Sequence, residues 1–168
     1  SGLCAREGAS SPSPPAPGAP FKHPDFYRLL MVKLYTLHIF NRQGAPLYYQ
    51  EWARQRQPAG GDLAEEHKLM FGFLFSLKQL VGKMSPKKGG GFYAASTSSY
   101  KLNYYETASG LRFVLCTELG VGDMREVLRH VYANIFVECL TKNPMWRVDE
   151  PISCPMFVQD VSKYLESL

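Results

Sequence analysis

The chain has 168 residues, of which 45% are hydrophobic, which is enough for one domain with a sizeable core. Its formal net charge of +4 comes from scattered basic residues, which argues against the dense basic clusters of nucleic-acid binding. The four cysteines stand far apart without metal-ligand spacing, so neither a zinc site nor a disulfide framework is indicated. The most apolar run, LMFGFLFSL at 69–77, is far shorter than the roughly 20 residues of a transmembrane helix.

Residues 1–30 differ in composition from the rest of the chain. Half of the 12 prolines fall before position 25, and the run ASSPSPPAPGAP is of low complexity. Such a segment buries too little apolar area to offset the entropy that it would lose on ordering. We therefore expect residues 1–30 to be a disordered leader, Met31 to be a candidate start, and residues 31–168 to form the domain.

A hairpin and a long helix are expected first. The runs LYTLHIF at 34–40 and PLYYQEW at 46–52 read as strands, and NRQG at 41–44 as the turn between them. Asp62 then suits the N-cap of a helix whose apolar residues recur three, four and seven residues apart. Ser85 and Pro86 end this helix, because the residue before a proline disfavours helical geometry.

A second β region and two helices are expected after it. The strands are FYAASTSS at 92–99, YKLNYYET at 100–107 and LRFVLCTE at 111–118. A helix follows from a cap at Asp123 to about Lys142, and an amphipathic helix begins near Pro155. That last helix is expected to place Phe157, Val161, Tyr164 and Leu168 on one face.

The predicted order is β-β-α-β-β-β-α-α, an α/β (α+β) arrangement. A five-stranded antiparallel sheet with helices on both faces is the simplest way to bury these elements. In the first strand, alternation puts Leu34 and Phe40 on one face. It puts Tyr35, Leu37 and Ile39 on the other face, so both faces need cover.

The stretch CTELGVGDMREVL at 116–128 has the Gly-x-Gly of a nucleotide-binding loop, but its surroundings argue against that function. Arg125 occupies the place of the third glycine, no strand follows the helix, and Asp123 puts a negative charge where phosphate would bind. A strand-to-helix turn explains the loop better. His67 and His130 lack a partner nucleophile and are expected to be structural, so we expect no catalytic, cofactor-binding or metal-binding residue.

The two long helices carry more apolar residues than one buried face requires. Because monomers seldom expose large apolar patches, this surplus predicts protein interfaces. Phe71 and Phe75, one helical turn apart, are the expected anchors. The full candidate interface is Leu69, Phe71, Phe73, Phe75, Tyr132, Phe136 and Val137.

Three segments also carry a family resemblance. They are LYTLHIFNRQGAPLYYQEW, EEHKLMFGFLFSLKQLVGKMSP and the long run that starts YKLNYYET and ends TKNP. In this order and spacing, over essentially all of 32–145, the chain resembles the subunit 1 family of the TRAPP vesicle-tethering complex, its smallest longin-type subunits. The resemblance implies a longin-like (SNARE-like) fold.

The resemblance also implies a function. Such subunits assemble with other small TRAPP subunits into a core that promotes nucleotide exchange on a Rab-family GTPase in ER-to-Golgi transport. The chain is then a structural subunit and no enzyme by itself, without cofactor or nucleic-acid partner. It would lie in the cytoplasm, at the cytosolic face of Golgi and endoplasmic reticulum membranes, and meet membranes only through the complex.

Two alternatives stay open. The small chain of a clathrin-type adaptor is also longin-like, and it too begins with a strand, a turn and a strand that ends in tryptophan. YKLNYYET and KMSP argue against it. An RNA-binding module would explain KKGGGFY with Tyr93, Tyr100 and Tyr104 nearby, but its β-α-β-β-α-β order differs from the one predicted here.

Overall fold

The computed structural model describes residues 32–54, 61–86, 91–147 and 149–168, and the predicted leader at 1–30 and Met31 lie outside these ranges. The strands of the described part are β1 (Leu34–Phe40), β2 (Pro46–Glu51), β3 (Ala94–Ser96), β4 (Lys101–Glu106) and β5 (Arg112–Thr117). Its helices are α2 (Leu63–Met84), α3 (Arg125–His130), η2 (Val131–Thr141) and α4 (Pro155–Glu166). With α3 and η2 taken as one continuous helix, the predicted element order is confirmed.

The strands form one antiparallel sheet in the order β2-β1-β5-β4-β3. The turn between β1 and β2 forms as predicted, because Gly44 adopts a φ of 91° and the Asn41 side chain accepts hydrogen bonds from the next backbone amides. β3 is much shorter than the predicted 92–99. The Thr97 side chain accepts a hydrogen bond from the Tyr100 amide and donates one to its carbonyl, which turns the chain after Ser96.

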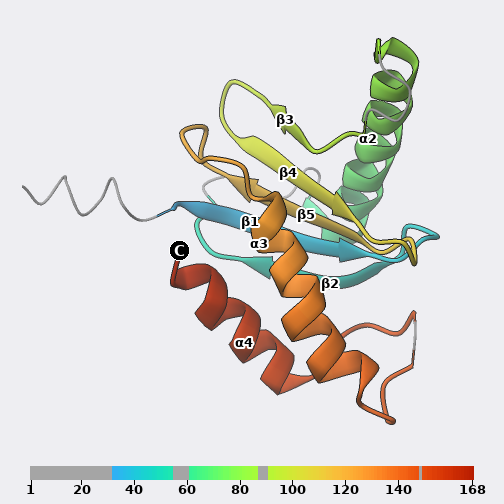
Figure 1. The fold of residues 1–168 in the computed structure, drawn as a ribbon, viewed down its shortest axis with the longest axis vertical. Helices are drawn as coiled ribbons and strands as arrows, with labels where there is room; N and C mark the ends of the chain where they lie inside the picture. Colours follow the sequence, from blue (N-terminus) through green and yellow to red (C-terminus); the bar gives the residue numbers. More distant parts are fainter. Residues whose placement is uncertain (1–31, 55–60, 87–90, 148) are drawn as a thin grey trace, which may run out of the picture. The chain divides into compact units, whose positions relative to one another are not determined.

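Helices cover both faces of the sheet, as predicted (Figure 1). α2 lies on one face, over a cluster called here the α2-side core: Phe40, Leu74, Phe92, Leu102, Tyr104, Val114 and Cys116. α3, η2 and α4 lie on the other face over the larger α4-side core, which includes Leu37, Ile39, Phe113, Leu128, Phe136, Phe157 and Val161. The strands serve both cores because successive side chains point to opposite faces.

The faces of β1 differ from the prediction at its first residues. Leu34 packs in the α4-side core together with Leu37 and Ile39, while Tyr35 packs against the α2-side core with Phe40. The pairing of β1 with β5 shifts between Leu34 and Thr36. Such a bulge inserts one residue and exchanges the faces of the side chains before it, so simple alternation fails here.

The outer helices begin where predicted. Asp62 caps α2, since its Oδ1 accepts a hydrogen bond from the Ala64 amide at 2.9 Å, and Pro155 is the first residue of α4. In α4 the buried residues are Phe157, Val161 and Leu165. Leu168, which was predicted on this face, follows the end of the helix and is 37% exposed.

The helix after β5 changes its winding along its length. From Val131 to Thr141 it is a π-helix, whose hydrogen bonds close five residues apart, as between the Lys142 amide and the Val137 carbonyl oxygen. Residues five apart therefore share a side, and Val131 and Phe136 are both buried, as are Ile135 and Leu140. This winding turns Phe136 into the core.

Candidate protein-interaction surfaces

The outer side of α2 carries a row of exposed apolar side chains. Leu69, Phe73, Leu80 and Met84 are 57%, 40%, 52% and 72% exposed. Their spacings of four, seven and four residues put them on one side of the helix, and we call them the outer stripe of α2. A pocket of about 210 Å³ lies beside this stripe, lined by Glu66, Leu69, Met70, Phe73 and Tyr100.

The inner side of α2 explains why the stripe remains uncovered. Leu74 and His67 are buried, and Met70, Leu77 and Val81 pack against the α2-side core as half-buried residues. This inner row already uses the apolar residues that a helix on a sheet needs. The outer stripe is additional, and no described residue of this chain covers it fully.

The structure separates the two expected anchors on α2. Phe71 is half-buried, with its ring centroid 5.9 Å from that of Phe40 and the Arg112 guanidinium 4.9 Å from the ring centroid. A Cβ on Gly44 would come within 2.6 Å of this ring, so Phe71 fills the space beside the β1–β2 turn. Phe75 is 53% exposed and lies on the opposite edge of the helix from the stripe.

The candidates on the second helix pack inside the domain. Phe136 is 2% exposed and belongs to the α4-side core, which removes it from any surface of the folded chain. Tyr132 is half-buried among the rings of Tyr105, Phe113 and Phe136, and Val137 is half-buried. Of the seven candidates, Leu69, Phe73 and Phe75 are the ones that α2 presents to solvent.

Two buried histidines lie beneath the first half of α2. His38 of β1 is 1% exposed, and its ring centroid is 5.5 Å from that of His67. Burial, with the charges of His67 and Arg54, lowers the pKa of His38 to about 3, and burial also lowers the pKa of His67. Both rings are therefore neutral at pH 7.

The glycine loop before α3 is anchored from the sheet. The Lys101 ammonium of β4 donates hydrogen bonds to the carbonyl oxygens of Val121 and Gly122, at 2.9 and 2.8 Å. The Asp123 Oδ1 accepts a hydrogen bond from the Arg125 amide at 3.0 Å, but the N-cap of α3 is Met124, one residue after the predicted cap, and its side chain makes no capping hydrogen bond. The loop is thus a fixed strand-to-helix turn.

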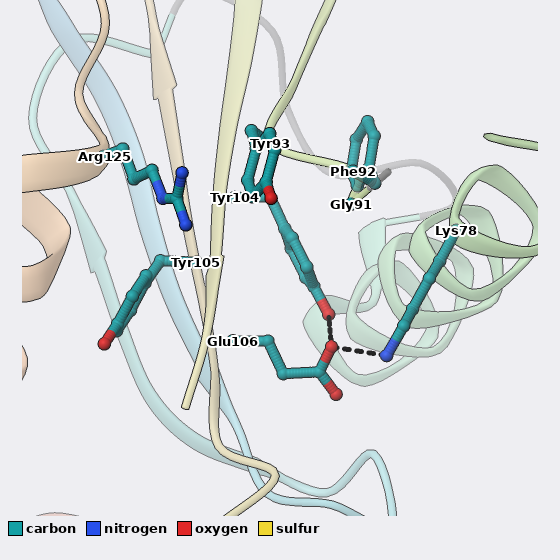
Figure 2. A pocket seen from close by; sticks show the side chains of 8 residues that line it. All are labelled: Lys78, Gly91, Phe92, Tyr93, Tyr104, Tyr105, Glu106 and Arg125. Atoms are coloured by element: carbon teal, nitrogen blue, oxygen red, sulfur yellow. Dashed lines mark hydrogen bonds and ion pairs between the residues drawn. The ribbon is translucent and has the colours of Figure 1, made fainter. Parts of the chain in front are cut away.

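A second hollow lies at the outer edge of β4 (Figure 2). It has a volume of about 270 Å³ and is lined by Lys78, Gly91, Phe92, Tyr93, Tyr104, Tyr105, Glu106 and Arg125. Sequence reasoning noted Tyr93 and Tyr104 only for the RNA-binding alternative and missed Glu106. The hairpin of β4 with β5 follows from the glycine-containing turn between them, but the position of Arg125 beside β4 cannot be read from a linear sequence.

The carboxylate of Glu106 is fully engaged inside this pocket. It accepts hydrogen bonds from the Tyr104 hydroxyl and the Lys78 ammonium, and the Arg112 Nε lies 3.5 Å from its Oε1. Burial alone would raise the pKa of Glu106, but these hydrogen bonds and cations outweigh it and lower the pKa. Glu106 is therefore ionised and paired within the chain.

Within the described ranges, no three histidine, cysteine, aspartate or glutamate side chains come together as a metal site. In the same ranges, none of the helices has the length and apolar content to span a bilayer.

A small longin-like domain with exposed apolar area on its longest helix is typical of a subunit built for assembly. The Sybindin-like family model matches residues 34–168. Trafficking protein particle complex subunit 1 of Homo sapiens is 43% identical over 138 residues, which cover 82% of this chain and 94% of the relative. The protein of that name in Dictyostelium discoideum is 37% identical over 80% of this chain and 96% of the relative. Subunit BET5 of that complex in Saccharomyces cerevisiae is 31% identical over 66% of this chain and 73% of the relative. The chain belongs to the Sybindin-like family.

Proposed function

We propose that this chain is a structural subunit of the TRAPP tethering complex and assembles with other small TRAPP subunits. The observation that carries the proposal is the 43% identity that extends over 94% of the human subunit 1. The Sybindin-like match over residues 34–168 supports it, since it covers every described strand and helix. The match is therefore to a whole subunit.

The outer stripe of α2 is the surface that we assign to this assembly. Full burial of one leucine or phenylalanine side chain stabilises an interface by about 1.5–3 kcal/mol. Leu69 and Phe73 flank a hollow that could receive a partner side chain, and Leu80 and Met84 extend the apolar area along the helix. Such central apolar anchors commonly dominate binding energy.

The assembled core would promote guanine-nucleotide exchange on a Rab-family GTPase in transport between the endoplasmic reticulum and the Golgi. In this role the chain acts at the cytosolic face of those membranes, through the complex, and contributes shape instead of a reacting group. Opening the nucleotide site of a GTPase through a composite surface requires no acid, base or metal from this subunit. The family resemblance supports this finer assignment.

Affinity purification tests the proposal. The tagged 168-residue chain is recovered from an extract of its own cells, and co-purifying proteins are quantified by mass spectrometry. We expect a near-stoichiometric set of other small TRAPP subunits, and we expect the recovered assembly to accelerate nucleotide release from a Rab GTPase. Recovery with large clathrin-adaptor chains, or as a lone monomer, would contradict the proposal.

A further inference from the structure

The outer edge of β4 keeps backbone groups that no described strand pairs with. The Tyr104 amide donates to the Tyr93 carbonyl oxygen at 2.7 Å, which places the Tyr104 amide on the side away from β5. Because successive amides of a strand point to alternate sides, the Glu106 amide faces that same outer side. The Thr107 amide donates to the Leu111 carbonyl oxygen and so faces β5, as this alternation requires. β3 begins only at Ala94, and among the described residues no strand pairs with the outer side of Glu106.

Arg125 brings an uncompensated positive charge to this edge. Its guanidinium carbon lies 4.0 Å from the centroid of the Tyr93 ring, and among the described residues no carboxylate pairs with it. Glu106, the acidic group of this pocket, is already engaged by Lys78 and Arg112. An anionic group beside Arg125 would therefore meet a cation already oriented by an aromatic ring.

The side chains that line the pocket at the outer edge of β4 lie on both sides of this strand. Figure 2 shows Tyr104, Glu106 and Lys78 on one side of β4, and Tyr105 with Arg125 on the other. A strand added along this edge would point its successive side chains alternately to these two sides. One of them would reach Arg125, and its neighbours would reach the aromatic side formed by Phe92 and Tyr104.

We propose that the outer edge of β4 binds an extended acidic segment of a partner protein, which adds to the sheet as a strand and places a carboxylate against Arg125. Main-chain hydrogen bonds to the free edge supply affinity, and the alternating side-chain sites supply specificity. The edge lies apart from the outer stripe of α2, so this partner segment is additional to the assembly surface assigned above. Its binding does not depend on the chain being in the complex.

A library of random dodecapeptides displayed on phage provides the probe. Selection is made against the full 168-residue chain, and the chain with Arg125→Glu serves as a decoy for counter-selection. We expect the enriched peptides to share an aspartate or glutamate flanked by β-formers. Binding of the corresponding synthetic peptides, followed by fluorescence anisotropy, should be weakened at least about tenfold by Arg125→Glu, the loss of one charge-assisted contact.

Arg129→Glu is the matched control, because Arg129 is an exposed arginine one turn further along the same helix. It should change the dissociation constant by less than about twofold, as expected of a screened surface charge. Hydrogen exchange at the Glu106 amide should slow when peptide binds, and methylation of the peptide backbone nitrogens should abolish binding. A selection without acidic enrichment, or peptides that bind Arg125→Glu or their N-methylated forms equally well, would overturn the proposal.

Discussion

The two faces of the sheet are covered in different ways. On the α4 side, 17 buried residues of the described part form one core under α3, η2 and α4, with Phe113, Phe136 and Phe157 in edge-to-face contact. On the α2 side, 7 buried residues lie under one helix, together with two neutral histidines and the ion pair between Arg54 and Glu66. The α4 side therefore supplies most of the apolar burial that stabilises the fold.

This difference explains the dual character of α2. A single helix on a sheet needs one apolar side, which Leu74 and its half-buried neighbours provide. The outer stripe of α2 adds a second apolar side, and burying it would require another chain. Assembly with another chain would therefore complete the burial of apolar side chains on the α2 side, which is the less completely covered face of the sheet.

The largest effect on stability is expected from Phe157→Ala in the α4-side core. Phe157 is fully buried and its ring centroid lies 5.1 Å from that of Tyr48. Its truncation should lower the free energy of unfolding by about 3–5 kcal/mol, measured by urea denaturation. Phe75→Ala on exposed α2 surface is the matched variant and should cost less than about 1 kcal/mol. Equal losses for the two variants would refute the contrast between the faces.

Acid should weaken the α2 side through its histidines. The lowered pKa of His38, about 3, and the lowered pKa of His67 mean that below pH 6.5 the unfolded chain binds more protons than the folded chain. The free energy of unfolding therefore falls as the pH drops, by at most about 1.4 kcal/mol per pH unit for each histidine. Urea denaturation between pH 6.5 and 5 measures this slope, and His38→Phe should reduce it. An unchanged slope would show that His38 does not control it.

A smaller effect is expected from the cap of α2. Asp62→Ala removes the hydrogen bond to the Ala64 amide and should cost about 1 kcal/mol in the free energy of unfolding. Asp62→Asn keeps an accepting oxygen and should cost much less. Hydrogen exchange by amides of the first turn of α2 should be faster in Asp62→Ala. Equal stability of the alanine and asparagine variants would show that the cap is dispensable.

The smallest effect is expected from an exposed ion pair on the α4 side. Lys142 and Glu138 are 63% and 56% exposed and lie one helical turn apart. Lys142→Ala should change the free energy of unfolding by less than about 0.5 kcal/mol, because water and salt screen such a pair. A loss comparable to that of Phe157→Ala would mean that surface charge, and not apolar burial, distinguishes the two faces.

Much of the fold could be predicted from local signals. Gly44, Asp62 and Pro155 mark a turn, a cap and a helix start, and each acts where its chemistry indicates. The bulge near Tyr35 and the π-winding around Phe136 could not be predicted, because both depend on which distant residues pack against the segment. Simple periodicities therefore misplaced Leu34 and left Phe136 on a candidate surface.

The candidate interaction surface was predictable only in part, for a related reason. Helical periodicity identified a surplus of apolar residues on α2, but the side of the helix that faces the sheet decides which of them are exposed. Phe71 and Phe75 are one turn apart, yet Phe71 fills the space beside Gly44 while Phe75 remains at the surface. The edge of β4 required the sheet order, which no local pattern gives.

The most direct test of the central claim compares partner recovery with stability for the outer stripe of α2. One tagged chain carries Leu69→Ser together with Phe73→Ser, and the control chain carries Met156→Ser, at an exposed apolar residue of α4. Each chain is recovered from cell extract, and the proteins that co-purify with it are quantified by mass spectrometry. The unfolding of each purified chain is measured in parallel. We predict that the double variant folds with nearly unchanged stability but loses its co-purifying TRAPP subunits, while Met156→Ser keeps them. Full recovery of those subunits by a folded double variant would contradict the account.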